Sequence, residues 1–221
     1  MPLIRKFRLT YGTVPPGERG GGTTGKMTEG YTVSSPPDIP YRYLLQVLPS
    51  AEKTYPLFVA LSDLLDSECM GVLEVHESEA VVTYGSVGVS REGILSALEP
   101  CSFRLVNDGY TGFGVASPSF EVFVTDHKDV RVFAQELSRV ETVLGTFDLR
   151  KRRSLRLLGP ERHYHVPLVA YFEEEKIARL GEPLPARELD RYRREPQSYG
   201  EFRQSIIEQL RMRIQSRTKP T

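Results

Sequence analysis

Apolar side chains occur in short runs, or alternate with polar ones, through much of the middle of the chain. Runs of about four to eight residues bounded by Gly, Pro, Asn, Asp or Ser are typical of β-strands. Asn107-Asp108-Gly109 lies between two such runs and predicts a hairpin turn. We expect strands over residues 3–11, 71–78, 79–86, 102–108, 110–117, 120–126 and 165–172, and a strand or a short helix over 41–48.

Apolar residues three or four positions apart predict helices elsewhere. A first helix, with Pro56 in its first turn, is expected to end near Asp66. A second, short helix is capped by Ser90 and ends before Pro100. A third covers residues 132–144 and stops at Gly145.

The last helix has the clearest start. Ser198 and Glu201 have the spacing of a capping box, in which each side chain satisfies a backbone N–H of the other residue. The apolar stripe that follows consists of Phe202, Ile206, Leu210 and Ile214. This stripe predicts a helix that buries one face.

Residues 12–40 are rich in Gly and Pro, which predicts a long loop or a mobile arm. Together the elements predict an α+β fold with an antiparallel-rich sheet and two or three packed helices. We expect the core domain over residues 41–180. The N-terminal strand and Gly-rich arm over 1–40 precede it, and a basic helical extension over 181–221 follows.

The glycine-rich segment is close to a nucleotide-binding P-loop. Gly20, Gly25 and Lys26 have the spacing of that motif, but Met27 replaces the hydroxyl residue that would hold Mg²⁺. Pro36 and Pro37 leave little room for the helix that must follow the lysine. We therefore expect no nucleotide at this loop, and no cofactor.

Asp108, Asp126 and Lys128 are candidate catalytic residues. A strand–turn–strand unit that ends in Asp-x-Lys and precedes a helix resembles the core of the PD-(D/E)xK nucleases, over about residues 90–145. The resemblance implies that Asp108 and Asp126 hold a divalent metal and that Lys128 orients or activates the attacking water. No Pro precedes Asp108, which departs from the family pattern. The alternative is a turn aspartate and two solvated residues at a strand end.

His163 and His165 form a second candidate site. On a strand, residues two apart place both rings on one face, as some metal sites require. Further ligands would come from elsewhere, such as His76, His127 or Asp126. The alternative is a pair of polar residues on an exposed strand.

Composition favours a cytoplasmic protein. Cys69 and Cys101 form no C-x-x-C pair, as is usual in a reducing compartment. No apolar run approaches the roughly 18 residues that span a bilayer, and residues 1–12 lack the apolar segment of a secretory signal. We therefore expect no membrane partner.

The balanced net charge hides an asymmetry. Residues 1–149 hold 12 Lys or Arg and 19 Asp or Glu, a net of −7, whereas residues 150–221 hold 17 and 10, a net of +7. A basic run marks the change of sign and is the candidate binding surface: Arg150, Lys151, Arg152, Arg153 and Arg156. No aromatic residue interleaves the four consecutive basic residues to stack bases, so we favour a protein partner or self-association over nucleic acid.

The sequence therefore predicts a non-enzymatic cytosolic interaction protein that uses its basic C-terminal region. A metal-dependent nuclease with Asp108, Asp126 and Lys128 is the alternative.

Overall fold

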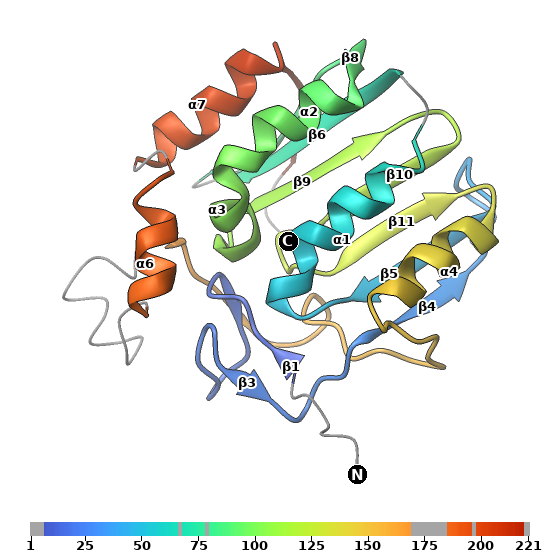
Figure 1. The fold of residues 1–221 in the computed structure, drawn as a ribbon, viewed down its shortest axis with the longest axis horizontal. Coiled ribbons are helices and arrows are strands. Elements are labelled where there is room, and N and C mark those ends of the chain that lie inside the picture. Colours follow the sequence, from blue (N-terminus) through green and yellow to red (C-terminus); the bar gives the residue numbers. More distant parts are fainter. Residues whose placement is uncertain (1–6, 66–67, 78–79, 169–184, 196–197, 219–221) are drawn as a thin grey trace.

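The structure is a computed structural model that describes residues 7–65, 68–77, 80–168, 185–195 and 198–218. Its main feature is a nine-stranded antiparallel sheet with strand order β13-β7-β6-β9-β10-β11-β5-β4 and a short β8 paired to β6 (Figure 1). In chain order the strands are β4 (Gly30–Ser34), β5 (Tyr43–Leu48), β6 (Glu68–His76), β7 (Val81–Gly85), β8 (Val89–Ser90), β9 (Thr111–Ala116), β10 (Phe120–Val124), β11 (Val130–Ala134) and β13 (Arg213–Thr218). The three regions expected from the sequence all contribute strands to this sheet.

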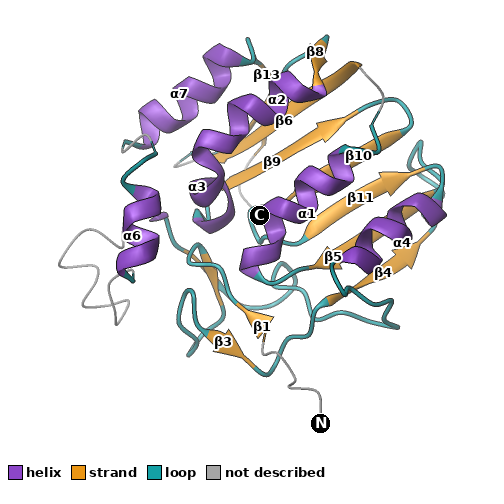
Figure 2. Cartoon of the chain, viewed as in Figure 1, coloured by secondary structure: helices purple, strands orange, loops and turns teal. Residues whose placement is uncertain are grey.

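Helices cover one face of the sheet (Figures 1 and 2). They are α1 (Ala51–Ser62), α2 (Arg91–Leu98), α3 (Ser102–Asn107), which follows the 3₁₀ turn η1 (Glu99–Cys101), α4 (Leu137–Thr146) and α7 (Tyr199–Gln209). α6 (Ala186–Tyr192) lies beyond the ends of the strands and packs against α3. Alternate strand residues such as Leu73, Phe113 and Val122 are fully buried against Phe58 and Phe202. Each such side chain contributes about 1.5–3 kcal/mol of burial free energy. The α+β class and the antiparallel-rich sheet predicted from the sequence are confirmed.

The opposite face of the sheet carries half-buried side chains of mixed polarity. Along β6, the exposed or half-buried Met70, Glu74 and His76 alternate with the buried Leu73 and Val75. His76 ends this strand, so the period of two places its ring on the open face at one end of the sheet.

Two small strand pairs attach the N-terminal segment. β1 (Phe7–Arg8) pairs with β3 (Thr23–Thr24), and β2 (Thr13–Val14) pairs with β12 (Tyr164–His165). The Thr13 hydroxyl donates to the carbonyl oxygen of Asp126 at 2.8 Å, which ties β2 and β12 to the turn between β10 and β11. A Cβ at Gly109 would lie 1.9 Å from the Gly12 oxygen, so the backbones meet where only glycine fits.

Several expected elements are confirmed. Residues 43–48 are a strand rather than a helix, and β6 and β7 form the expected antiparallel pair. The Ser90 side chain caps α2 by accepting from the Gly93 N–H, and Ser198 and Glu201 form both bonds of the capping box. As expected, the described chain forms no helix immediately after Lys26.

The predicted strand over residues 102–108 is wrong. These residues form α3, which continues directly from η1 with Pro100 in the first turn. Phe103, Leu105 and Val106 are all buried because this short helix is enclosed on several sides, so their pattern does not distinguish helix from strand. Asp108 therefore follows a helix and does not form the tip of a hairpin.

Three helix boundaries also differ from the prediction. Residues 130–134 form β11 because Val130, Val132 and Ala134 alternate inward, and the helix over 132–144 is replaced by α4 over 137–146. α1 begins at Ala51, which places Pro56 inside the helix, not in its first turn. α7 ends at Gln209, and Arg211 with φ of 50° redirects the chain into β13.

Two further segments need correction. Residues 30–34, expected within an irregular arm, form β4 at the sheet edge. Ile214 lies in β13 and is half exposed, so it does not extend the buried stripe of α7. The expected strands over 3–11 and 165–172 contain only the two-residue β1 and the end of β12 in their described parts, and residues 3–6 and 169–172 lie outside the described residues.

In the described chain no helix is both long and apolar enough to cross a membrane.

Candidate metal centre

The four histidines of the chain lie close together: His76, His127 and His165 lie within 4 Å of the Asp126 carboxylate, and His163 contacts His165. His76 ends β6, and Asp126 and His127 occupy the turn between β10 and β11. His163 and His165 lie on either side of Tyr164 in the segment of β12. Three parts of the chain that are distant in sequence therefore meet at one end of the sheet.

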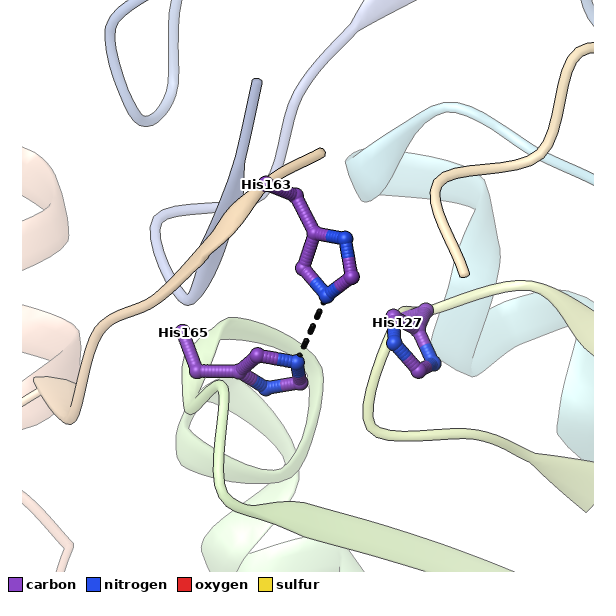
Figure 3. Close-up of side chains that lie close together, drawn as sticks. All are labelled: His127, His163 and His165. Atoms are coloured by element: carbon purple, nitrogen blue, oxygen red, sulfur yellow. Dashed lines mark hydrogen bonds between the residues drawn. The ribbon is translucent and has the colours of Figure 1, made fainter. Parts of the chain in front are cut away.

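Three imidazole rings lie close together, those of His127, His163 and His165 (Figure 3). The ligand atoms of His127, His163 and His165 all lie within 4.8 Å of one another. His163 Nε2 is 2.8 Å from His165 Nε2, and the His127 ring centroid is 4.6 Å from that of His163. The sequence predicts His163 and His165 as a pair, with His76, His127 or Asp126 as possible further ligands, and the structure places His127 beside the pair.

The outer nitrogen of each of these rings lies next to an oxygen atom. His163 Nδ1 lies 2.6 Å from the Glu161 carbonyl oxygen, and His165 Nδ1 lies 2.5 Å from the Gly109 carbonyl oxygen. His127 Nδ1 lies 2.7 Å from Asp126 Oδ1. A carbonyl or carboxylate oxygen only accepts, so each Nδ1 carries the proton and donates. A ring that carries its only N–H at Nδ1 keeps a lone pair on Nε2.

This arrangement leaves the His163 and His165 Nε2 lone pairs pointing at each other across 2.8 Å. Two lone pairs at that distance repel, so the contact requires a proton or a metal ion between the rings. Burial lowers the pKa of His165, only partly opposed by its bond to Gly109 and by Asp126, which disfavours the proton. A metal ion bound by the Nε2 atoms satisfies the same lone pairs without protonating a ring.

Asp126 is almost fully buried and connects the histidines. Its Oδ1 accepts from His127, and its Oδ2 lies 3.0 Å from His76 Nε2. Burial alone would raise the pKa of this carboxyl, but the bonds from His127 and His76 hold it well below its ordinary value. A carboxylate behind a histidine in this way fixes the ring and increases its basicity as a metal ligand.

Lys128 stabilises the turn that carries Asp126 and His127. Its buried amine donates to the carbonyl oxygens of Leu105 at 2.9 Å and Thr111 at 2.5 Å. The residue has φ of 66°, a left-handed conformation that usually costs a non-glycine residue on the order of 1 kcal/mol. Within the described chain Lys128 forms no ion pair with Asp108 or Asp126.

Asp108 has a comparable role on the other side of the site. Its Oδ1 accepts from the Tyr110 N–H at 2.9 Å, and its Oδ2 accepts from the Leu168 N–H at 3.0 Å. It thereby anchors both Gly109, whose oxygen holds His165, and the chain that follows His165. Asp108 belongs to neither group of potential metal ligands that the described residues form. The nuclease function stays a prediction, which would require Asp108 and Asp126 to share a metal position.

Glu74 is a site residue that the sequence interpretation missed. Its carboxylate forms a second group of potential ligands with His76 and Asp126, whose ligand atoms again lie within 4.8 Å of one another. Burial raises the pKa of Glu74, and the nearby Asp126 raises it further. The signal was present as Glu74-x-His76 on β6, which has the same spacing as His163-x-His165.

A hollow of about 240 Å³ adjoins this second group on the open face of the sheet. Its lining includes Glu74, His76, Asp126 and His127, together with Phe123 and Arg131. The site is therefore accessible to a small molecule from this face.

The basic run lies elsewhere, along the edge of β4. The Tyr31 N–H donates to the Arg150 carbonyl oxygen and the Arg152 N–H donates to the Tyr31 carbonyl oxygen. Lys151 pairs with Glu141 at 3.6 Å, and Arg156 forms a two-pronged pair with Glu161 at 2.6 Å. The guanidinium groups of Arg150, Arg152 and Arg153 are exposed, with no ion pair to any described residue.

Comparisons of the chain with protein-family models, with curated proteins and with solved structures find no match. Functional inference therefore rests on the geometry of the site.

Proposed function

We propose that the chain binds one divalent transition metal through the Nε2 atoms of His127, His163 and His165, and that this centre activates water for a hydrolytic reaction. The observation that carries the proposal is that one ligand nitrogen from each of the three rings lies within 4.8 Å of the others, while the Nδ1 of each ring lies next to a fixed oxygen. Metal-ligating histidines almost always have such an outer partner.

The ligand set favours zinc or a similar ion. Three neutral imidazoles suit Zn²⁺, Co²⁺ and Ni²⁺ better than Mg²⁺ or Ca²⁺, which prefer oxygen ligands. Zinc sites with three protein ligands leave a fourth position for water, whereas structural zinc sites have four protein ligands. A metal at such a position lowers the pKa of its water to about 7 and so supplies a hydroxide nucleophile near neutral pH.

Each of the three ligand rings is oriented by a different neighbouring group. Asp126 orients His127, and the Glu161 and Gly109 carbonyl oxygens orient His163 and His165. Arg156 fixes the side chain of Glu161 at the start of the His163 segment. The half-buried ligand rings leave the site in contact with solvent, as a hydrolytic centre requires.

Cobalt substitution tests this proposal. A Co²⁺ titration of the metal-free protein should saturate at one ion and give the visible absorption of a tetrahedral site. His163→Ala should lose this signal, whereas Tyr164→Ala should keep it, because Tyr164 lies between the two histidines but its side chain is 55% exposed. The zinc-loaded wild type should hydrolyse an activated ester such as p-nitrophenyl acetate faster than the metal-free protein and the His163→Ala variant do.

The proposal fails if wild type and His163→Ala bind Co²⁺ alike. If Co²⁺ binding depends on His163 but the ester is not hydrolysed, the metal site is supported and hydrolysis of this ester class is excluded.

A protein-interaction function, expected from the sequence, is a second candidate. The observation that favours it is the exposure of Arg150, Arg152 and Arg153 without ion pairs in the described chain. These side chains are available to an acidic partner or to a second copy of the chain.

A further inference from the structure

We infer that Glu74, His76 and Asp126 form a second cation site beside the three-histidine centre, so that the chain holds a two-metal centre linked by Asp126. This inference rests on the proposed function, because it places the second ion next to the first. The ligand is a divalent cation bound by two carboxylate oxygens and by the His76 Nε2 atom, whose proton moves to Nδ1 when the cation binds.

The geometry of the three side chains is the first observation. Asp126 Oδ2 lies 3.0 Å from His76 Nε2, and Glu74 Oε1 lies 3.9 Å from the same nitrogen. One ligand atom from each residue lies within 4.8 Å of the other two, so a single ion placed between them could contact all three. All three side chains come from strand or turn positions that the sheet fixes, β6 for two of them and the β10–β11 turn for the third.

The second observation is that the Glu74 carboxylate lacks a hydrogen-bond donor among the described residues. No hydrogen bond from the described residues reaches its carboxylate, and His76 at 3.9 Å is its ion-pair partner there. A single N–H of His76 at Nε2 is already within bonding distance of Asp126. The two carboxylates thus share one imidazole, which hydrogen-bonds to Asp126 and lies 3.9 Å from Glu74. A half-buried carboxylate without a hydrogen-bond donor is costly. A cation between them supplies the missing positive charge.

The hollow of about 240 Å³ is the third observation, because these three residues line it. A cation held at its wall would keep coordination positions open toward the hollow, where water or a substrate group can bind. Arg131 and Thr218 border the same space and offer donors to an anionic group.

The ligand set predicts a harder ion than the first site. Two carboxylates and one imidazole suit Mn²⁺ or Fe²⁺ as well as Zn²⁺, whereas three imidazoles favour the later metals. Asp126 serves both positions, since its Oδ2 would bind the second ion while its Oδ1 orients His127 at the first. Two ions at adjoining positions can stabilise both the attacking oxygen and the leaving oxygen of a displacement reaction.

Sequential loading tests the inference. Metal-free protein is first saturated with one equivalent of Zn²⁺ and then titrated with Mn²⁺, and free Mn²⁺ is followed by electron paramagnetic resonance. We expect one Mn²⁺ per chain in addition to the zinc. Glu74→Gln should weaken Mn²⁺ binding by more than the roughly tenfold that loss of an outer-shell partner costs, because it removes a direct ligand.

Glu121→Gln is the matched control. Glu121 is a half-buried carboxylate on β10, on the same face of the sheet, and belongs to neither ligand group. This variant should bind both ions as wild type does. Retained zinc binding in Glu74→Gln shows that this variant is folded, so that its loss of Mn²⁺ reports on the second site alone.

Two results would overturn the inference. Wild type that binds zinc but no Mn²⁺ would exclude the second site and leave the three-histidine centre intact. Mn²⁺ binding that is equal in wild type and Glu74→Gln would place that ion elsewhere. Absence of zinc binding in wild type would instead refute the proposed function itself, which separates the two failures.

Discussion

At the scale of single residues, the candidate site depends on which nitrogen of each histidine carries the proton. The oxygen acceptors of Glu161, Gly109 and Asp126 decide this by holding the three Nδ1–H groups. The sequence indicates His163 and His165 through their spacing and names Asp126 and His127 as possible partners. It could not identify the two carbonyl acceptors, because every residue has a backbone oxygen and only the fold decides which of them meets a histidine.

The role of Asp126 predicts the effect of its neutral isostere. Asp126→Asn keeps an oxygen near His127 but removes the charge that makes the ring a stronger ligand, so the Kd for Zn²⁺ or Co²⁺ at the three-histidine centre should rise about 10–100-fold. Competition with a metal chelator of known affinity measures this change. Asp148→Asn is the control, since Asp148 is exposed and its φ of 57° suits asparagine. Unchanged affinity in Asp126→Asn would show that the carboxylate does not support the site.

At the scale of elements, periodicity identified the sheet better than the helices. β6 and β10 alternate between buried and less buried positions, and short connections follow them, so the period of two can be recognised in the sequence. β9 is buried along its whole length and is recognised by the turn residues on either side of it. The pattern of α3 predicts a strand because residues on all its sides are buried, so no helical apolar stripe is left in the sequence. The convergence of β12 with the β10–β11 turn could not be predicted, because it depends on the remote pairing of β12 with β2 and on the Thr13 bond to Asp126.

The boundary between α7 and β13 leads to a prediction about stability. Phe202 is fully buried in the core, so Phe202→Ala should lower the free energy of unfolding by about 3–5 kcal/mol. Ile214 belonged to the same stripe in the sequence, but it is 50% exposed on β13, so Ile214→Ala should change stability by no more than about 0.5 kcal/mol. Urea denaturation of the two variants measures both values. Equal, large losses would indicate that the helix continues through Ile214.

At the scale of the whole molecule, α6 and α7 are attached to the core through buried polar groups. The Glu195 carboxylate accepts from the Phe103 and Arg104 N–H groups at the start of α3. Arg104 is itself buried and donates to the Ser198 carbonyl oxygen just before α7. This contact could not be predicted, because Glu195 is one of many charged residues in the C-terminal region.

The burial of Glu195 predicts a pH dependence of stability. Burial raises the pKa of Glu195 to about 7, against the opposing bonds from Arg104 and Phe103. The folded state therefore keeps this proton at pH values where the unfolded chain has lost it, and stability falls as pH rises from about 4.5 to 7. The loss from this group is on the order of 3 kcal/mol at most.

Glu195→Gln isolates this contribution, because glutamine does not titrate. Urea denaturation of metal-free protein between pH 5 and 8 should show a steeper fall in wild type than in the variant. Parallel curves for the two proteins would contradict a raised pKa at Glu195.

The charge asymmetry of the chain leads to a prediction about partners. Arg150/Arg152/Arg153→Glu should alter self-association, followed by sedimentation, while retention of duplex DNA in a gel-shift assay stays weak in both proteins near the roughly 0.15 M salt of physiological solutions. The exposed set Arg42/Arg139/Arg194→Glu provides the charge-matched control. Tight retention by wild type that is lost in the first variant, with a log–log salt slope smaller by about 3, would favour nucleic acid instead.

The central claim concerns the ligands of the metal, and X-ray absorption of the protein loaded with one equivalent of Zn²⁺ measures them directly. The account predicts about three nitrogen scatterers near 2.0–2.1 Å, with the outer-shell pattern of imidazole rings, and one further light atom in a four-coordinate shell. His163→Ala should reduce the imidazole contribution or abolish zinc binding. A shell of oxygen atoms without imidazole scattering, or a spectrum unchanged in His163→Ala, would contradict the three-histidine centre.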